Sequence, residues 1–530
     1  MPRRLPLLPI ALVGIVVIAV TWWIDDRGTG DLASSEGSGE VAVATEQTTT
    51  TTTEPPYEGW SDPSKSGQPW PDATVEGLLT FRGNPTRSFY GTGPVPKTDP
   101  DVAFRFPESG GMCGESTNLG TTKTWCGMGW TGQPTIFEKD GRTWSVFGAY
   151  DGAVHFIDAD TGERILPDFP TGDLIKGTVT IDPDGCPLVY TGSRDNKYRI
   201  LSVDGTEAVE LWSMHADDFS PTKWNDDWDS SGMIIEDFLF VGGENSQFVI
   251  VKLNRGYDAA GNVTVAPERA FNVPSWDDEL LAAIGDETVS VESSPTVVAN
   301  TVYFANSGGL IQGYDIEGLA DGVTPTRTFR FWTGDDTDAS VVADADGMLY
   351  VASEYERSGT AARSDVVGQL MKLDPTVAEG EDPLVWSYLD NSVRPGGMWA
   401  TPAIHGDVVY AATNGGELLG IDRATGAELW SKKLAGPLWG SPVVVDDVLL
   451  IGDCAGVFHA FDVSAAGEEP PLLWAKELGG CIEATPAVWD GRILIGTRSG
   501  ALFSLVAPGD TPGDTAGGTA GDATTSTAAG

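Results

Sequence analysis

The stretch NGGELLGIDRATGAELW, residues 414–430, holds two short runs of alternating apolar and polar residues. An Asp-x-x-Thr-Gly turn from Asp422 to Gly426 separates the runs, and Trp430 closes the second one. Directly before it, ATPAIHGDVVYAAT (residues 400–413) shows an apolar run, a Gly-Asp turn and another apolar run, which is typical of a β-hairpin. Together the two stretches predict four short antiparallel strands, with glycine taking the positive φ of the last tight turn.

This four-strand unit recurs along the chain. Four-stranded repeats of about 40 to 65 residues are typical of β-propeller blades. Segments with helical periodicity are short, and the nearest is DDELLAAIG from Asp277. The sequence therefore predicts an all-β, eight-bladed β-propeller of four-stranded blades over residues 59–507. The units start at Gly132, Gly177, Ser230, Ser293, Ala339, Ala400, Gly440 and Ala484.

A large apolar residue recurs on the fourth strand of these units. Such a side chain would fill the wedge between neighbouring blades and contribute a few kcal/mol per blade. The last unit stops at Val506 after three strands, and Asp101 to Glu108 form a lone strand-like segment. We expect this N-terminal strand to close the ring, with Phe104 or Phe106 in the aromatic position, because closure removes two exposed edges. The other units carry Leu166, Trp212, Phe271, Trp332, Trp386, Trp430 and Trp474 there.

The N-terminus predicts a membrane anchor. Arg3 and Arg4 precede residues 5–24, LPLLPIALVGIVVIAVTWWI, a run long enough to cross a bilayer, with Trp22 and Trp23 at its outer edge. A cleaved signal peptide is the alternative, but the run ends without small residues before a cleavage site. We expect residues 1–4 in the cytoplasm, a transmembrane signal-anchor at 5–24, and the propeller on the extracytoplasmic side of the cell membrane. Residues 25–58 and 508–530, rich in Gly, Ser, Thr and Pro, predict a disordered linker and tail.

Charge and cysteine content narrow the class of protein. The net charge of -45, from 77 acidic and 32 basic residues, argues against binding nucleic acid. It is typical of a solvated, self-repelling surface, and a surface for a cationic partner is the alternative. Five cysteines fit an oxidising compartment, and we expect disulfides Cys113–Cys126 and Cys454–Cys481 with Cys186 left over. A zinc site lacks any Cys-x-x-Cys support.

The turn pattern resembles a known repeat. GIDRATGAELW (residues 420–430) and FIDADTGERIL (residues 156–166) are similar to the pyrroloquinoline-quinone-like repeat of eight-bladed propellers. That resemblance implies one of two functions: a quinoprotein dehydrogenase holding the quinone with Ca²⁺ in the central funnel, or a non-enzymatic scaffold that binds proteins, as in outer-membrane β-barrel assembly. In the dehydrogenases the quinone lies between a tryptophan and a disulfide of two adjacent cysteines. This sequence has no adjacent cysteine pair.

A common register predicts which side chains face the funnel. Calcium suits a cluster of carboxylates such as Glu292 and Asp338, and a cationic ligand over Trp399 or Trp439 is the other option. The alternative is a water-filled channel in which the acids pair with Lys176. The cluster WNDDWDSSG, residues 224–232, is either a loop at the funnel rim or packing of an insertion. The residues before the first strands are Thr131, Lys176, Asp229, Glu292, Asp338, Trp399, Trp439 and Glu483.

Motifs for nucleophilic catalysis are missing. The chain has four histidines, and it contains neither a Gly-x-Ser-x-Gly elbow nor a phosphate-binding loop. We therefore expect a monomeric, membrane-anchored binding or scaffold module without a cofactor, whose protein partner or small ligand binds at the funnel. The alternative is an oxidoreductase that depends on pyrroloquinoline quinone and calcium. It would use Asp229, Glu292, Asp338 and either Trp399 or Trp439.

Overall fold

The structure is a computed structural model that describes residues 57–118, 120–130, 132–378 and 380–510. The predicted cytoplasmic residues, the transmembrane segment 5–24, nearly all of the linker and the tail from residue 511 lie outside the described residues. Within the described ranges, no helix combines the length and the apolar character needed to cross a membrane. The same ranges contain the predicted propeller apart from residues 119, 131 and 379.

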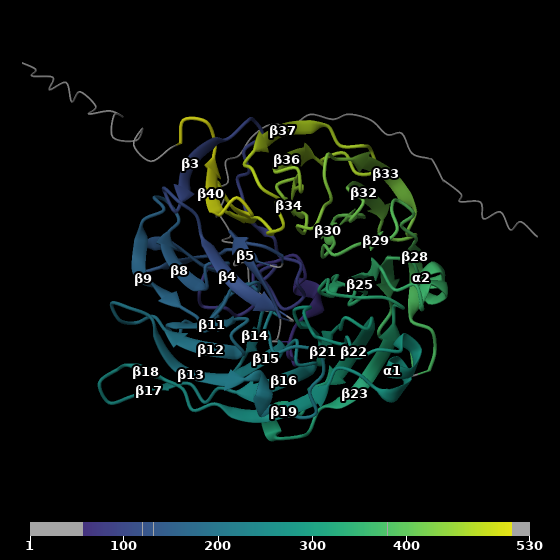
Figure 1. Ribbon diagram of the computed structural model, residues 1–530, viewed down its shortest axis with the longest axis horizontal. Helices are drawn as coiled ribbons and strands as arrows, with labels where there is room; N and C mark the ends of the chain where they lie inside the picture. Colours follow the sequence, from purple (N-terminus) through teal and green to yellow (C-terminus); the bar gives the residue numbers. More distant parts are fainter. Residues whose placement is uncertain (1–56, 119, 131, 379, 511–530) are drawn as a thin grey trace, which may run out of the picture. The chain divides into compact units, whose positions relative to one another are not determined.

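Eight antiparallel sheets stand around one axis, which confirms the predicted eight-bladed propeller of four-stranded blades (Figure 1). Blades 1 to 4 are β6 (Thr135–Lys139), β7 (Arg142–Gly148), β8 (Ala153–Asp158) and β9 (Arg164–Pro170); β10 (Thr180–Ile181), β11 (Leu188–Gly192), β12 (Lys197–Ser202) and β13 (Val209–His215); β14 (Met233–Ile235), β15 (Phe238–Gly242), β16 (Gln247–Lys252) and β19 (Glu268–Pro274); and β20 (Thr296–Val298), β21 (Thr301–Phe304), β22 (Leu310–Asp315) and β23 (Thr326–Trp332).

Blades 5 to 8 follow in the same order. They are β24 (Val342–Ala343), β25 (Leu349–Ala352), β27 (Leu370–Leu373) and β28 (Leu384–Tyr388); β30 (Ala403–His405), β31 (Val408–Ala412), β32 (Glu417–Asp422) and β33 (Glu428–Lys433); β34 (Val443–Val445), β35 (Val448–Gly452), β36 (Val457–Asp462) and β37 (Leu472–Glu477); and β38 (Ala487–Trp489), β39 (Arg492–Thr497) and β40 (Ala501–Val506) with β3 (Asp101–Phe106).

The remaining elements are short. Two strands extend blades 1 and 8 toward the axis, and three two-stranded ladders and five helical turns lie in connections between strands. The axial strands are β1 (Gly77–Leu78) and β2 (Gly91–Thr92); the ladders are β4 (Cys113–Asn118) with β5 (Thr121–Cys126), β17 (Gly256–Tyr257) with β18 (Val263–Thr264), and β26 (Glu354–Tyr355) with β29 (Gly396–Gly397); the helical turns are η1 (Pro63–Lys65), η2 (Ala216–Asp218), α1 (Asp278–Ile284), η3 (Leu319–Asp321) and α2 (Ala361–Val367).

The aromatic residue on the outer strand lies in the wedge between blades, as predicted. In blade 5, Nε1 of Trp386 donates to the carbonyl oxygen of Arg423 in blade 6 at 3.0 Å. A Cβ atom on Gly426, in the Thr-Gly turn of blade 6, would lie 2.7 Å from the Trp386 ring. A side chain at that turn would therefore collide with the tryptophan, which explains why the turn and the aromatic residue recur together.

In blade 4 the prediction for this position was wrong. Trp332 pairs with Leu310 at one end of the ladder, whereas Phe329 pairs with Gly313 directly before a β-bulge. Trp430 in blade 6 occupies the same place before its own bulge. Phe329 is buried and Trp332 is partly exposed. The bulge re-aims the strand, so its position decides which aromatic residue faces the next blade.

The N-terminal strand closes the ring, also as predicted. β3 pairs antiparallel with β40, and Figure 1 shows the blue and yellow strands side by side. Phe104 takes the aromatic position, because it pairs with Ser504 next to the bulge and a Cβ on Gly162 of blade 1 would lie 2.7 Å from its ring. Phe106 lies edge-on against Phe147 of blade 1, with 5.7 Å between ring centroids.

Residues 77–92 plug one end of the axis, which the sequence did not predict. β1 pairs with β6 and β2 with β38, and the buried chain between them bonds to the inner strands of other blades. Arg82 and Arg87 are completely buried. An open, water-filled channel is therefore excluded at this end. The two guanidinium groups donate to backbone oxygens of Ser231, Pro295, Thr401, Pro402 and Pro442.

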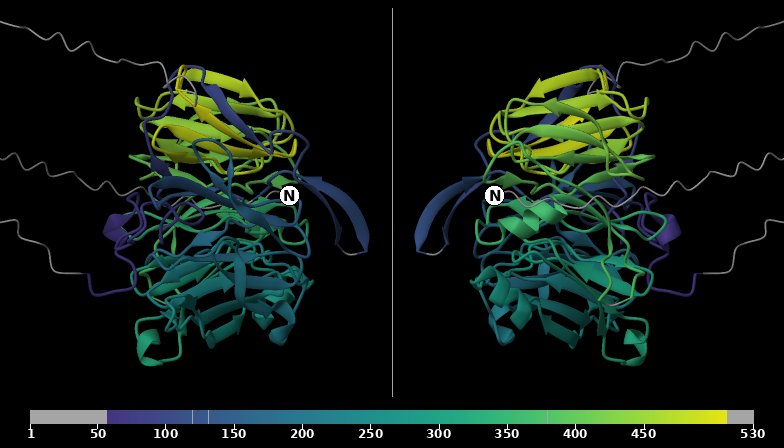
Figure 2. Two further views of the ribbon diagram at one scale, coloured as in Figure 1. Left: turned by 90° about the vertical axis from the view of Figure 1, so that its left-hand side faces the viewer. Right: turned by 90° about the vertical axis from the view of Figure 1, so that its right-hand side faces the viewer.

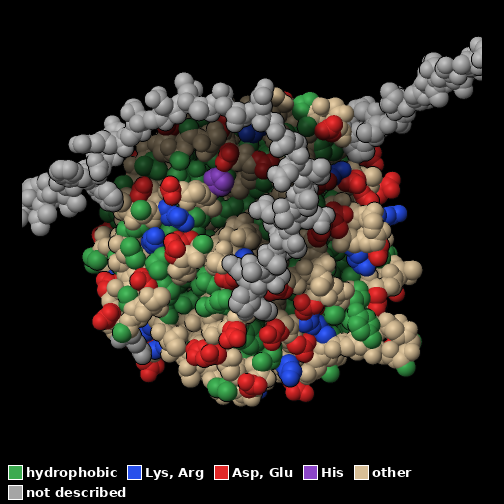
Figure 3. All heavy atoms as spheres, turned by 180° about the vertical axis from the view of Figure 1, so that it is seen from behind, with side chains coloured by type: hydrophobic (Ala, Val, Ile, Leu, Met, Phe, Trp, Pro, Cys, Tyr) green, Lys and Arg blue, Asp and Glu red, His purple; other side chains and the backbone are tan. Residues whose placement is uncertain are grey.

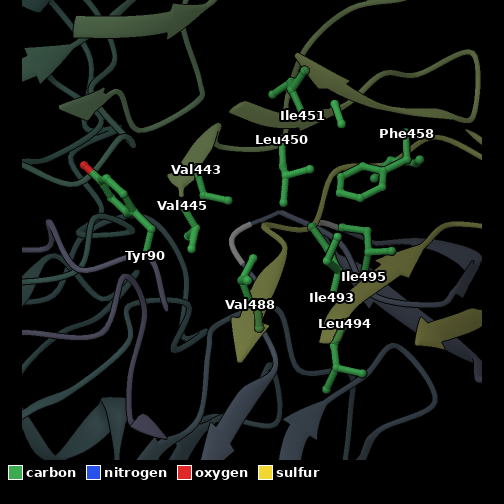
Figure 4. Packing of buried hydrophobic residues seen from close by; sticks show 14 of the residues in the cluster. Tyr90, Val443, Val445, Leu450, Ile451, Phe458, Val488, Ile493, Leu494 and Ile495 are labelled. Carbon is green, nitrogen blue, oxygen red and sulfur yellow. The ribbon is translucent and has the colours of Figure 1, made fainter. Parts of the chain in front are cut away.

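The core runs from blade to blade. Inner faces of blades 7 and 8 meet each other and Tyr90 of the plug (Figure 4). On the face seen in Figure 3, acidic side chains are spread among polar and apolar ones rather than gathered in one patch. The apolar residues labelled in Figure 4 are Tyr90, Val443, Val445, Leu450, Ile451, Phe458, Val488, Ile493, Leu494 and Ile495.

Candidate functional site

A series of hydroxyl groups joins the inner ends of blades 1 to 7, and we call it the hydroxyl ring. The backbone N–H of one member donates to the side-chain oxygen of the member in the next blade; the bond from Ser340 to Thr401 measures 3.0 Å. These bonds explain why Ser or Thr recurs at the start of blades 2 to 7. The members, beginning with the backbone of Gln133, are Thr178, Ser231, Ser294, Ser340, Thr401 and Ser441.

The predicted funnel residues stand two positions before the hydroxyl ring. Alternate residues of extended chain point to the same side, so the side chains at these positions also turn toward the axis. Six of the eight line one pocket of about 330 Å³. Asp229 lies behind the pocket wall, bonded to Lys176, and Thr131 lies outside the described residues. The six are Lys176, Glu292, Asp338, Trp399, Trp439 and Glu483.

Four further lining residues escaped the sequence analysis: Trp125, Trp130, Tyr150 and Arg498. Tyr150 and Arg498 come from the turn between the second and third strands of their blades, two residues before a glycine with positive φ. Glu244 and Ser307 occupy the equivalent position in blades 3 and 4. The residue at this turn position recurs from blade to blade, so the turn pattern in the sequence could have identified Tyr150 and Arg498 as lining residues.

One side of the pocket pairs its charges internally, and we call it the paired side. Lys176 Nζ contacts the carboxylates of Asp229 and Glu244, the latter at 3.0 Å. Arg498 Nη1 lies 3.0 Å from both carboxylate oxygens of Glu483. Burial opposes both charges, but the two carboxylates raise the pKa of Lys176, and Lys176 lowers the pKa of Glu244 to about 2. Lys176 and Glu244 therefore form an ionised pair at neutral pH, whereas burial raises the pKa of Asp229 to about 7.

The cluster at residues 224–232 supports this side. Asp227 contacts Arg194, and Trp228 is fully buried against Tyr198 and Phe219. Of the two roles considered for this cluster, the structure shows packing for Trp228. None of residues 224–232 is among the residues that line the pocket.

The opposite side collects acids without cations, and we call Glu292, Asp336, Asp338 and Glu354 the acidic side. Among the described residues, no lysine, arginine or histidine lies within ion-pair distance of these four. Ser290 donates to Glu292 at 3.0 Å, and Ser307 donates to Asp338 at 3.1 Å. Burial raises the pKa of each carboxyl group, and the neighbouring acids raise it further.

Aromatic rings form the rest of the wall. The centroids of Trp399 and Trp439 are 4.8 Å apart, and those of Trp130 and Trp399 are 6.4 Å apart. Arg498 lies over both Trp125 and Tyr150, 4.9 Å from each centroid. The pocket thus combines indole faces with carboxylates, a lining that suits ligands with an apolar body and a charged or hydroxylated group.

Comparison with known proteins agrees with this architecture. Residues 376–511 match the family model PQQ_2, described as outer membrane protein assembly factor BamB. This match covers the C-terminal part of the propeller, from before β28 to after β40. No curated protein sequence matches the chain. Quinohemoprotein alcohol dehydrogenase from Comamonas testosteroni shares the fold at 14% identity, with a TM-score of 0.55 over 82% of this chain and 81% of that one. BamB from Moraxella catarrhalis, also 14% identical, aligns with a TM-score of 0.35 over 69% of this chain and 83% of that one.

The two disulfides were predicted correctly. Cys113 bonds to Cys126, Cys454 bonds to Cys481, and Cys186 is free. The first bond joins the two strands of the β4–β5 hairpin next to Trp125, and the hairpin projects from one face of the propeller while the first described residues lie on the other (Figure 2). Neither bond supplies the adjacent-cysteine disulfide that the quinoprotein resemblance implies.

The charges of this propeller also bear on a quinone. Pyrroloquinoline quinone carries three carboxylates, and the cations that line the pocket, Lys176 and Arg498, are already bonded to protein carboxylates. The donor set therefore fits the quinone poorly. A hard cation fits better, because one oxygen from each of Asp336, Asp338 and Glu354 lies within 4.8 Å of the others. Of the two predicted metal ligands, Asp338 belongs to this triad and Glu292 does not.

No histidine side chain lines the described part of the pocket. His155 contacts Asp151 and Asp168 inside blade 1, and His459 bonds to Asp453 inside blade 7. The lining residues of this propeller include no histidine, serine or cysteine.

Proposed function

We propose that this propeller is a binding module that takes a small ligand, or a segment of a protein partner, into the funnel pocket. We also propose that residues 5–24 anchor it in the cell membrane with the pocket on the extracytoplasmic side. Two disulfides support an oxidising compartment.

The aromatic lining of the pocket carries the proposal. The pocket walls come from segments spread around the ring, and the lining holds four tryptophans. These rings are only partly buried, and the part of a large apolar ring that stays in contact with water contributes nothing to folding. Four of them at one concave site therefore support a role in binding.

The first experiment asks whether a ligand travels with the protein. The full chain is purified from its own cell envelope, unfolded, and the released compounds and peptides are identified by mass spectrometry. We expect a species that is present with the wild type and missing with Trp399→Ala. Tyr257→Ala, which removes an exposed aromatic side chain from the β17–β18 hairpin, is the matched control. Identical profiles for all three proteins would contradict the proposal.

The anchor needs its own measurement. Mass spectrometry of the membrane fraction should recover a peptide that contains residues before position 24. A mature protein that begins after this position would contradict the anchor and leave the pocket proposal untouched.

An oxidoreductase using the quinone and calcium is the second candidate, favoured by the carboxylate triad of Asp336, Asp338 and Glu354. Calorimetric titration of the full chain with pyrroloquinoline quinone, with and without Ca²⁺, tests it. Tight binding that requires Ca²⁺ and is lost in Asp338→Asn would favour this candidate. Heat from Ca²⁺ alone would support a structural metal, and no heat from either would exclude the candidate.

A further inference from the structure

Charge is distributed unevenly around the pocket. The lining cations, Lys176 and Arg498, stand on the paired side and are each bonded to carboxylates. On the acidic side, Glu354 is 3% exposed and has no cationic partner among the described residues. An ionised carboxylate that is buried without a counter-charge costs several kcal/mol, so this wall favours any cation that reaches it.

The aromatic rings show the same division. Arg498 covers Trp125 and Tyr150, so their electron-rich faces already hold a protein cation. Within the described chain, no arginine or lysine is recorded over Trp130, Trp399 or Trp439. The indole N–H of Trp399 lies against the buried carboxylate of Glu354 and hydrogen-bonds to it. Uncovered indole faces therefore stand beside unpaired carboxylates.

We propose that the pocket binds an alkylammonium ion, with its charged head between the indoles of Trp399 and Trp439 and the carboxylates of Glu292 and Asp338. The inference rests on the proposed function, since it names the ligand class of that same pocket. Cations are attracted to the faces of tryptophan rings, and the attraction grows when the site is desolvated. On the paired side, Arg498 lies over Trp125 and Tyr150 and pairs with Glu483. The bound ion would make the same two kinds of contact on the acidic side.

Other ligand classes leave part of the wall unexplained. An anion would meet the unpaired acids. A divalent metal ion would use the triad of Asp336, Asp338 and Glu354 but would leave three indole faces uncovered. A neutral sugar could stack on the indoles, yet it would not compensate the charge of the acidic side. An organic cation satisfies both the carboxylates and the rings.

Ligand-observed NMR on the full chain tests the proposal at constant ionic strength. The probes are n-butylammonium, tetramethylammonium, 1-butanol as the neutral counterpart, and CaCl₂ as competitor. We expect both ammonium ions to bind and 1-butanol to bind at least about tenfold more weakly. Equal binding of 1-butanol and n-butylammonium would overturn the proposal, as would Ca²⁺ binding without any ammonium binding.

Variants locate the site. The double variant Glu292→Gln, Asp338→Asn should weaken n-butylammonium binding by about tenfold, because isosteric amides keep the shape and remove the charge. Trp399→Leu should weaken it separately. Glu207→Gln, an exposed carboxylate on blade 2, is the control and should leave the affinity within about twofold. Unchanged binding by the double variant would overturn the proposal.

A last measurement distinguishes two sources of the ammonium group, a lysine side chain of a protein partner and a free amine. Nα-acetyl-lysine amide binding about tenfold more tightly than n-butylammonium would indicate a lysine side chain of a protein partner. Equal or weaker binding would indicate a free amine. If no ammonium binds but the wild type still carries a ligand that Trp399→Ala lacks, the ligand class is wrong and the binding function stands. If no ammonium ion binds and no ligand that Trp399→Ala lacks is found, both the ligand class and the binding function are contradicted.

Discussion

Thr401→Val removes one hydroxyl from the hydroxyl ring while keeping the shape of the side chain. In the wild type this oxygen accepts from the backbone N–H of Ser340 at 3.0 Å, and the two residues are 2% and 1% exposed. A buried N–H that loses its acceptor costs about 1 to 3 kcal/mol. We expect the free energy of unfolding to fall by about 2 kcal/mol, because no water can replace the lost acceptor between blades 5 and 6.

Urea denaturation and calorimetry of the full chain measure this change. Roughly 450 ordered residues with an unfolding entropy of about 2 cal/mol/K each give about 0.9 kcal/mol/K, so the melting temperature should fall by about 2 °C. Thr326→Val, at an exposed position on β23, is the matched control and should change stability by less than about 0.5 kcal/mol. A Thr401→Val protein as stable as this control would refute the role of the hydroxyl ring in joining blades.

Three further outcomes follow from the structure. Phe329→Ala should cost about 3 to 5 kcal/mol in urea denaturation and Trp332→Ala clearly less, because only the phenylalanine fills the wedge between blades; equal losses would contradict the corrected register. Burial and the charge of a neighbouring glutamate raise the pKa of Asp336, so the wild type loses stability as pH rises above about 4. Asp336→Asn should therefore melt higher than the wild type at pH 8 and equally near pH 4, and a constant difference would contradict this. Reducing Cys113–Cys126 should open the projecting hairpin to trypsin while the blades resist, and cleavage unchanged by reductant would show that the ladder alone holds it.

The fold was predictable because its evidence is local and repeated. Alternation, Asp-Gly turns and the Thr-Gly turn each arise within one blade, so eight copies reinforce the same conclusion. Ring closure by residues 101–106 was predictable for a related reason, since a three-stranded last unit leaves an edge that a lone strand can pair. The strand TRTFRFW offers several aromatic residues, and its bulge decides between Phe329 and Trp332. No residue pattern in that strand marks the bulge.

The site was predictable in part. A register two residues before the recurrent Ser or Thr found Lys176 and five other lining residues, because strand alternation carries over from one blade to the next. Trp125, Tyr150 and Arg498 belong to a hairpin and to turns, where alternation gives no direction. Which acids are paired was also beyond the sequence. Asp229 and Asp338 share one register, yet only Asp229 lies within reach of Lys176.

The sequence by itself determined the blade, the number of blades, the disulfide partners and the ring of positions that face the axis. Those features depend on short-range periodicity and on side chains that repeat at equivalent positions. The tertiary structure alone decided that residues 77–92 close the axis, that the hydroxyls join successive blades, and that the pocket has a paired side and an acidic side. These features depend on distances between residues that are tens to hundreds of positions apart, and such distances exist only after the ring has closed.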